Sequence, residues 1–135
     1  MRFEEIAVGQ AAEFTRTVTE TDVVLFAGIT GDFNPAHVDA VAAAQGRFGG
    51  RIAHGMLSAS FISTVLGMKL PGPGTIYLSQ SLRFTRPVRI GDTVTARAEV
   101  AEVTAEKRRV RLATTVRNQD GDTVIDGEAV VMVPD

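Results

Sequence analysis

The most constraining feature of this chain is a change in the spacing of its apolar residues near Gly74. Before that point, residues 55–68 form an apolar stretch with several small side chains, which predicts a buried helix. After it, apolar and polar residues alternate with a period of two, as they do in strands with one buried face. Short connections between the alternating segments favour antiparallel pairing. Because helix and sheet each need an apolar partner, we predict an α+β fold in which the sheet curls around the helix.

Four alternating segments supply most of the expected sheet. They span residues 75–84, 94–103, 108–117 and 123–133. Turn-forming residues separate them, including a hairpin loop expected at 118–122. A fifth strand is expected over residues 12–18, where Thr and Phe are frequent. In the first alternating segment, the pattern places four apolar side chains on the face expected to be dry: Ile76, Leu78, Leu82 and Phe84.

A shorter helix is expected before the apolar one. Thr19 or Thr21 would cap its start, because a threonine hydroxyl accepts a hydrogen bond from an unpaired N–H of the first turn. Gly28 and Gly31 would end this helix. A short alanine-rich helical piece is expected at residues 39–45.

Composition narrows the class of protein. A length of 135 residues with 44% hydrophobic side chains predicts one domain, over residues 1–135, with a single core. A net charge of -2 without a basic block argues against a nucleic-acid partner, and the lack of cysteine excludes disulfides and a Cys nucleophile. The first nine residues carry acids where a signal peptide needs an apolar run, and residues 55–70 are too short to span a bilayer. We expect a cytoplasmic protein without a membrane partner.

Both histidines of the chain lie in two short segments, 27–39 and 52–57. Asp32 precedes His37 by five residues, and these are the side-chain types that most often move protons near neutral pH. Pro35 keeps the residue before it out of the helical region, which fixes the directions in which the two side chains leave the backbone. A purely structural interpretation is also open, with Asp32 as a turn residue and His37 as a capping or buried histidine.

The second segment adds a backbone donor. Gly55 begins the predicted buried helix, so its N–H has no partner within the helix and lies at the positive end of the helix dipole. The absence of a side chain lets a substrate carbonyl approach that N–H, as in an oxyanion site. A base, an acid and an oxyanion donor together suit proton transfer beside a thioester carbonyl. We expect the neighbouring His54 to be structural and to hold the loop before the helix.

Three segments of the chain resemble a known family. They are Gly31-Asp-Phe-Asn-Pro-Ala-His37, Ile52-Ala-His-Gly-Met56 and Phe84-Thr-Arg-Pro-Val-Arg-Ile-Gly-Asp92. Together they are similar to the MaoC-like hydratases of the hotdog fold, and more narrowly to the short (R)-specific enoyl-CoA hydratases that supply monomers for polyhydroxyalkanoate. The resemblance extends over residues 3–133, nearly the whole chain.

The resemblance implies a five-stranded antiparallel sheet wrapped around a long central helix, and a homodimer or higher even oligomer whose acyl-CoA tunnels are lined by both subunits. It implies that Asp32 and His37 are the catalytic pair and that the Gly55 N–H receives the thioester oxygen. The substrate-binding positions that it implies are Asn34, Ser63, Leu66 and Val131, of which the last two would belong to the acyl pocket that decides chain length.

The activity implied is reversible hydration of trans-2-enoyl-CoA to (R)-3-hydroxyacyl-CoA. This reaction is expected to need no metal or redox cofactor, and coenzyme A is part of the substrate. A 3-hydroxyacyl dehydratase acting on acyl carrier protein is an alternative, with Arg83, Arg86 and Arg89 as a docking patch, although these arginines equally suit CoA phosphates or solvent. A hotdog thioesterase would use a single carboxylate without the Asn-Pro-x-His continuation. A non-catalytic acyl-CoA-binding subunit would lack Asp32 or His37, and this chain has both.

Overall fold

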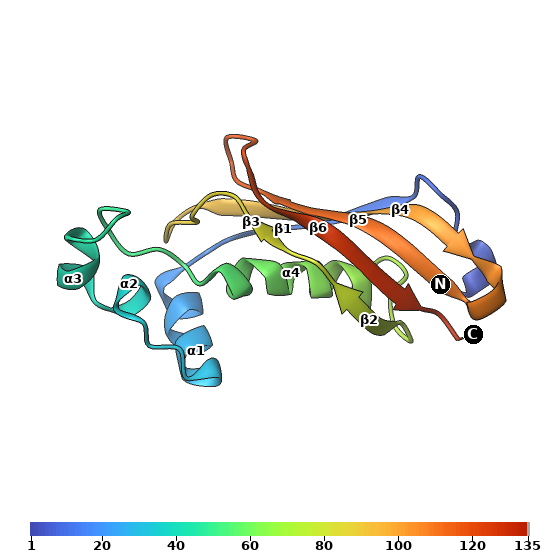
Figure 1. The fold of residues 1–135 in the computed structure, drawn as a ribbon, viewed down its shortest axis with the longest axis horizontal. Coiled ribbons are helices and arrows are strands. Elements are labelled where there is room, and N and C mark those ends of the chain that lie inside the picture. Colours follow the sequence, from blue (N-terminus) through green and yellow to red (C-terminus); the bar gives the residue numbers. More distant parts are fainter. Residues whose placement is uncertain (135) are drawn as a thin grey trace.

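A long antiparallel sheet lies over one central helix, and three shorter helices gather beyond one end of the sheet (Figure 1). The computed structural model describes residues 1–134, so the last residue of the expected domain span, Asp135, lies outside the described residues. The elements in chain order are a 3-10 turn (Phe3–Glu5), β1 (Ala11–Thr17), α1 (Glu20–Thr30), α2 (Pro35–Val38), α3 (Ala40–Ala44), α4 (Gly55–Met68), β2 (Ile76–Gln80), β3 (Arg83–Phe84), β4 (Thr93–Thr104), a 3-10 turn (Ala105–Lys107), β5 (Arg109–Arg117) and β6 (Thr123–Met132).

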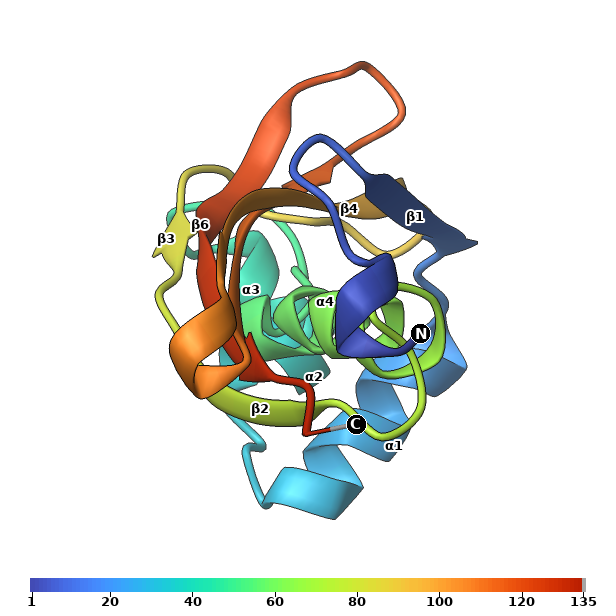
Figure 2. The same cartoon turned by 90° about the vertical axis from the view of Figure 1, so that its right-hand side faces the viewer.

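The strands follow the order β1-β4-β5-β6-β2, with the short β3 paired to β6. Figure 2 looks along α4 and shows the sheet arching around it, as the α+β prediction requires. The period-two pattern of β4 is confirmed, because Val94, Ala96, Ala98 and Val100 are all buried while Arg97 and Glu99 are exposed. β5 repeats the pattern. The five predicted strands are present, with β3 as a short sixth.

The central helix α4 matches the predicted span of residues 55–68, but only one side of it is buried. Its sheet-facing residues are Leu57, Ser58, Ala59, Phe61, Ile62, Val65 and Leu66. The opposite stripe, consisting of Met56, Ser60, Ser63 and Gly67, is exposed. The sequence suggested burial on most sides, and that expectation is wrong for the single chain. The small residues of the exposed stripe leave α4 accessible to another surface.

The segment predicted as one strand over residues 75–84 is broken into β2 and β3. β2 has a bulge between Tyr77 and Ser79, and the chain then continues alongside β6 into β3. A Cβ on Gly127 would lie 1.9 Å from the Ser81 carbonyl oxygen, so only glycine permits this close approach of the two backbones. The break and the edge position leave Ile76, Leu78 and Phe84 more than two-fifths exposed, which corrects their expected burial. Leu82 does pack against the core.

The helices that precede α4 are held by local caps. Thr19, one of the two predicted caps, accepts a hydrogen bond from the Asp22 N–H at 3.2 Å, and the Asp22 carboxylate accepts the Thr19 N–H at 2.9 Å. Gly31 ends α1 with a φ of 80°, a conformation that favours glycine. Gly28 lies inside α1, so the prediction that it ends the helix is wrong.

Two short helices follow α1. The four-residue α2 was not predicted, and Pro35 occupies its first turn, where the missing N–H has no intrahelical role. Asn34 is extended, with a ψ of 129°, as its place before proline requires. α3 lies within the predicted residues 39–45 and is capped by the Asp39 carboxylate. Among residues 1–134, no helix is both long enough and apolar enough to cross a membrane.

Candidate active site

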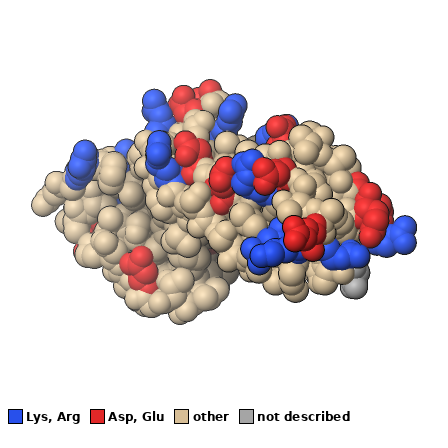
Figure 3. Space-filling model, turned by 45° about the vertical axis from the view of Figure 1, so that its right-hand side comes forward, with Lys and Arg blue, Asp and Glu red and all other residues tan. Residues whose placement is uncertain are grey.

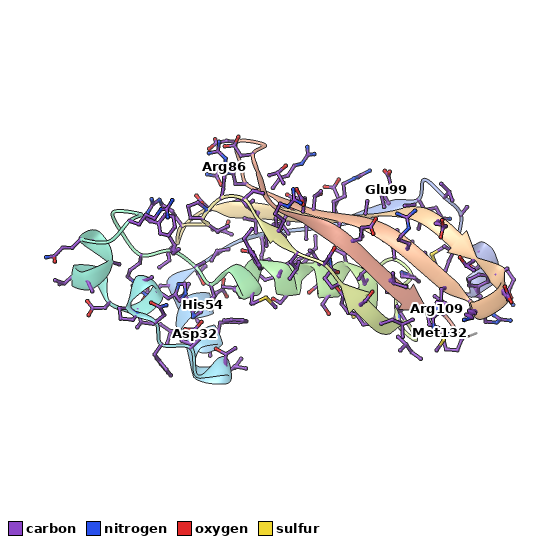
Figure 4. All side chains as sticks on the ribbon, in the orientation of Figure 1. Asp32, His54, Arg86, Glu99, Arg109 and Met132 are labelled. Carbon is purple, nitrogen blue, oxygen red and sulfur yellow. The ribbon has the colours of Figure 1, made fainter. Side chains whose placement is uncertain are left out.

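Three side chains from separate elements meet beside the first turn of α4. Asp32 lies in the loop after α1, His37 lies on α2, and His54 immediately precedes α4. One polar atom from each side chain lies within 4.8 Å of the other two. Figure 4 shows Asp32 and His54 at the end of α4 that faces α1 and α2. The fold therefore brings together the Asp32 and His37 side chains that the sequence paired.

The His37 ring is fixed through one of its two nitrogens. Nδ1 lies 2.8 Å from the carbonyl oxygen of Ile52. A carbonyl oxygen only accepts, so Nδ1 carries the hydrogen and the neutral ring keeps its lone pair on Nε2. His37 is half-buried, which shields the ring from bulk water without closing it off. The arrangement leaves Nε2 as the atom able to accept a proton.

Arg51 anchors the backbone of His37. Its Nε donates to the His37 carbonyl oxygen at 2.6 Å, and its Nη1 donates to both carboxylate oxygens of Glu20, at 2.8 and 3.0 Å. The guanidinium group thus links α2 to the start of α1. The sequence analysis missed this residue, because 31 positions separate Arg51 from Glu20 and no local pattern marks the pair.

Asp32 keeps the turn role that the structural interpretation gave it. Its Oδ1 accepts the Asn34 N–H at 3.1 Å, and its own N–H donates to the Thr30 hydroxyl at 3.1 Å. Asn34 in turn accepts the Ala36 N–H at 3.0 Å and so caps α2. The side chain of Asp32 is nevertheless exposed and lies beside the histidine cluster. The turn therefore fixes Asp32 in a position where its carboxylate is accessible.

Gly55 and His37 line the same cavity, whose volume is about 610 Å³. This volume is within the usual range for small-molecule sites. Phe48, Met56 and Phe84 contribute apolar walls, and Arg47 and Arg86 contribute cationic groups. A Cβ on Gly55 would lie 2.8 Å from two carbons of the Phe84 ring. A side chain at this position would therefore have to displace the Phe84 ring, in addition to obstructing the approach of a ligand.

Of the predicted catalytic and substrate-binding positions, only His37 and Gly55 belong to this cavity lining, and Asp32 and Asn34 lie outside it. Ser63 is on the exposed stripe of α4, whereas Leu66 and Val131 are core residues with exposed fractions of 1% and 0%. Their expected roles in acyl binding stay predictions. The lining includes Ser58, which the sequence analysis did not assign to the site. Its buried hydroxyl has no hydrogen-bond partner among the described residues.

The three arginines expected near a carrier-binding surface have different positions. Arg86 lines the cavity and lies 3.8 Å from the Asp122 carboxylate. Arg89 donates to the Phe48 carbonyl oxygen at 2.6 Å, so it holds a loop of the cavity wall. Arg83 is exposed on β3. Arg47, which the sequence analysis did not name, lines the cavity together with Arg86.

The Asp32, His37 and His54 cluster also has the residue types of a metal site. However, His37 Nδ1 and His54 Nε2 both contact backbone carbonyl oxygens. The two rings are stacked, with centroids 3.9 Å apart and planes inclined by 29°. Imidazole lone pairs lie in the ring plane, so nearly parallel rings do not converge on one ion. The geometry suits proton transfer better than metal coordination.

Comparisons with known proteins agree with this geometry. The family described as "MaoC like domain" matches residues 3–122. The (R)-specific enoyl-CoA hydratase of Rhodospirillum rubrum is 55% identical over 132 residues, which are 98% of this chain and 91% of the relative. The 3-hydroxybutyryl-CoA dehydratase of Methylorubrum extorquens is 52% identical over 132 residues, covering 98% of this chain and 83% of the relative.

A solved structure gives the same result in three dimensions. The R-hydratase PhaJ1 from Pseudomonas aeruginosa, in its unliganded form, superimposes with a TM-score of 0.94 and 53% sequence identity. The match covers 99% of this chain and 86% of that chain. This chain therefore belongs to the MaoC-like domain family and has its hotdog fold.

Proposed function

We propose that this protein hydrates trans-2-enoyl-CoA to (R)-3-hydroxyacyl-CoA and catalyses the reverse dehydration. The observation that carries the proposal is the position of His37. Its Nε2 is the proton-accepting nitrogen, its polar edge lies within 4.8 Å of the Asp32 carboxylate, and its ring lines the same cavity as Gly55. The relatives named as hydratase and dehydratase act on thioesters of this kind and support the assignment.

In the proposed reaction, the Asp32 carboxylate and His37 Nε2 bind one water molecule between them. The water oxygen adds to the β-carbon of the enoyl thioester, and the electron pair of the C=C bond moves toward the carbonyl. The Asp-His pair takes the proton released by the water and returns a proton to the α-carbon on the same face. The proposal assigns both proton transfers to the pair as a unit and not to either residue alone.

Gly55 is proposed to stabilise the negative charge that develops on the thioester oxygen. As the first residue of α4, it has an N–H without an intrahelical partner, and the helix dipole favours negative charge at this end. Removing one oxyanion donor typically costs about 10²–10³ in rate. Both proton transfers use side chains of this chain, so the proposed reaction needs no metal or redox cofactor.

A homodimer is part of the proposal, because the site is open in the single chain. The helical end of the molecule carries exposed apolar side chains at Val24, Leu25, Ile29 and Phe33. In Figure 3, charged side chains gather over the sheet, whereas the lobe at the left, at the helical end, carries few. The exposed edge strand β2 adds Ile76 and Leu78. A second copy covering these surfaces would also close the exposed stripe of α4, including Ser63, into a tunnel.

Several finer assignments stay predictions. Leu66 and Val131 are proposed to limit acyl length from within the core, Asn34 and Ser63 to contact substrate, and the protein to act in the cytoplasm. Supply of monomers for polyhydroxyalkanoate and fatty-acid breakdown are both consistent with the proposed reaction. The expected domain span of residues 1–135 contains the family match at residues 3–122.

The test is the loss of enoyl-thioester absorbance when the purified protein meets crotonyl-CoA, followed by chiral analysis of the product. The proposal expects rapid loss of absorbance and (R)-3-hydroxybutyryl-CoA. Release of free CoA would instead identify a thioesterase. Hydration restricted to enoyl groups on acyl carrier protein would identify the alternative dehydratase and would contradict the CoA assignment.

A further inference from the structure

The buried His54 is the one histidine that the proposed mechanism leaves unused. We infer that His54 is a positioning residue that sets the placement of both Asp32 and His37. Its Nε2–H holds the main chain of Asp32, and the face of its ring holds the ring of His37. This inference rests on the proposed function, because Asp32 and His37 need exact placement only if they act as the acid–base pair. The contacts that His54 makes do not depend on the reaction.

The first contact joins α4 to the loop that carries Asp32. His54 Nε2 lies 2.9 Å from the Asp32 carbonyl oxygen, and the side chain of His54 is only 2% exposed. Because the carbonyl accepts, Nε2 is the protonated nitrogen of the neutral ring. The other main-chain contacts of this loop are local, from Asp32 to Thr30 and from Phe33 to Gly31. The His54 bond instead spans 22 residues and fixes the loop against α4.

The second contact acts on the catalytic ring. His54 stacks on His37 with a separation of 3.9 Å between the ring centroids. Its ring centroid also lies 4.9 Å from that of Phe26 on α1. The bond from His37 Nδ1 to Ile52 fixes the edge of the His37 ring, whereas His54 fixes its face. Rotation of His37 about its side-chain bonds would break one of these contacts. Together they fix the orientation of the His37 ring, one nitrogen of which lies within 4.8 Å of an Asp32 carboxylate oxygen.

The usual structural role for a residue at this position does not explain His54. It is the N-cap residue of α4, where a side chain commonly accepts a hydrogen bond from an N–H of the first turn. His54 makes no such bond, and its buried Nδ1 has no partner among the described residues. A histidine at this position does not cap the helix and carries an unsatisfied nitrogen. Its Nε2–H donor and its ring face are therefore the features that explain why a histidine occupies position 54. Gly55 follows directly, so one residue links the acid–base pair to the proposed oxyanion donor.

Two substitutions separate the donor from the ring. His54→Gln keeps an N–H donor at similar reach, whereas His54→Phe keeps an aromatic face without a donor. With crotonyl-CoA, we expect His54→Phe to lower kcat by roughly 100-fold and to change KM by less than about threefold, as for a misplacement of catalytic groups. We expect His54→Gln to keep kcat within about tenfold of the native value. Val100→Ala, a core substitution on β4, controls for loss of stability alone.

Equal losses in His54→Gln and His54→Phe, or an unchanged kcat in His54→Phe, would overturn the assignment. A second measurement decides the matter even if the variants fold poorly. The chain has only two histidines, so imidazole ¹⁵N NMR of the native protein at pH 8 gives two resolvable rings. The expected result is the Nε2–H form of His54 and the Nδ1–H form of His37, and an Nδ1–H form of His54 would overturn the inference. The NMR result does not require activity, so an inactive native protein would contradict only the proposed function.

Discussion

Asp32 and His37 are separated by only five positions, yet distant parts of the chain fix their relative placement. His37 is held through Ile52 and Arg51, and Asp32 is held through its own turn and through His54. These contacts leave one nitrogen of the His37 ring and the exposed Asp32 carboxylate within 4.8 Å of each other. The proposed chemistry needs both groups at once, because one water molecule has to contact the pair.

Replacing either member of the pair tests this dependence. Asp32→Asn and His37→Gln are each expected to lower kcat for crotonyl-CoA by roughly 10²–10⁴, the usual contribution of a general acid or base. Asp39→Asn is the matched control, since Asp39 is an exposed carboxylate that caps α3 and its amide can still accept hydrogen bonds. Steady-state rates and thermal unfolding of all three variants are measured together. A near-native rate in either pair variant would remove that residue from the mechanism.

The role of Gly55 is testable by separating ligand access from the contact with Phe84. Gly55→Ala places a Cβ 2.8 Å from the Phe84 ring, so the single variant is expected to lose activity for either reason. The double variant Gly55→Ala/Phe84→Leu relieves the ring contact. We expect it to remain at least about tenfold below Phe84→Leu alone in kcat/KM, because the Cβ still crowds the proposed oxyanion site. Full recovery in the double variant would reduce Gly55 to a packing role.

The proximity of Asp32 to His37 and the start of α4 at Gly55 could be predicted from sequence, because each follows from a short local pattern. His54 was expected only to hold a loop, and Arg51 and Ser58 were missed. Their roles arise from contacts between segments that no local pattern relates. The bond from His54 to Asp32 crosses 22 positions, and the bond from Arg51 to Glu20 crosses 31. Such contacts depend on the packing of α4 against the loops and become visible only in three dimensions.

At the level of elements, the packing of the sheet around α4 could be predicted from sequence. The break between β2 and β3 at the edge of the sheet could not. β5, and β4 as far as Val100, keep a period of two, and each of these strands has a strand on both sides. A bulge in the pairing of β4 with β5 follows between Val100 and Glu102. Residues 75–84 show the same period of two, but β2 is an edge strand with a bulge, and Gly127 allows the Ser81 backbone to approach β6 closely. The sequence pattern carries no sign of that close approach. The apolar residues of the edge are therefore exposed in the single chain.

A substitution at Gly127 tests whether the close approach of Ser81 to β6 requires glycine. Gly127→Ala is expected to destabilise the fold by at least roughly 1–3 kcal/mol, because the new methyl group meets backbone that cannot move without breaking β2 or β3 pairing. Gly28→Ala is the control, for which we expect a change in stability of the opposite sign. Gly28 lies inside α1 with open space around a new Cβ, so the substitution should stabilise the fold by about 0.5–1 kcal/mol. Urea unfolding gives both values, and a neutral Gly127→Ala would contradict the close approach of the Ser81 backbone to Gly127.

At the level of the whole molecule, the exposed apolar surfaces favour a second copy. α1, the exposed stripe of α4 and the edge strand β2 all present apolar or small side chains to solvent in the single chain. We expect sedimentation equilibrium to give the mass of two chains or a higher even number. Leu78→Asp on β2 should weaken the assembly and lower activity with it. Val8→Asp, at an exposed position outside the proposed interface, should change neither.

Hydration of crotonyl-CoA in D₂O by the native protein tests whether Asp32 and His37 carry out both proton transfers. A single acid–base pair that removes a proton from water and returns one to the α-carbon works on one face of the substrate. The account therefore predicts (R)-3-hydroxybutyryl-CoA with one deuterium at the α-carbon, on the same face as the new hydroxyl group. Deuterium on the opposite face would require a second proton donor across the site and would contradict the assignment of both steps to Asp32 and His37.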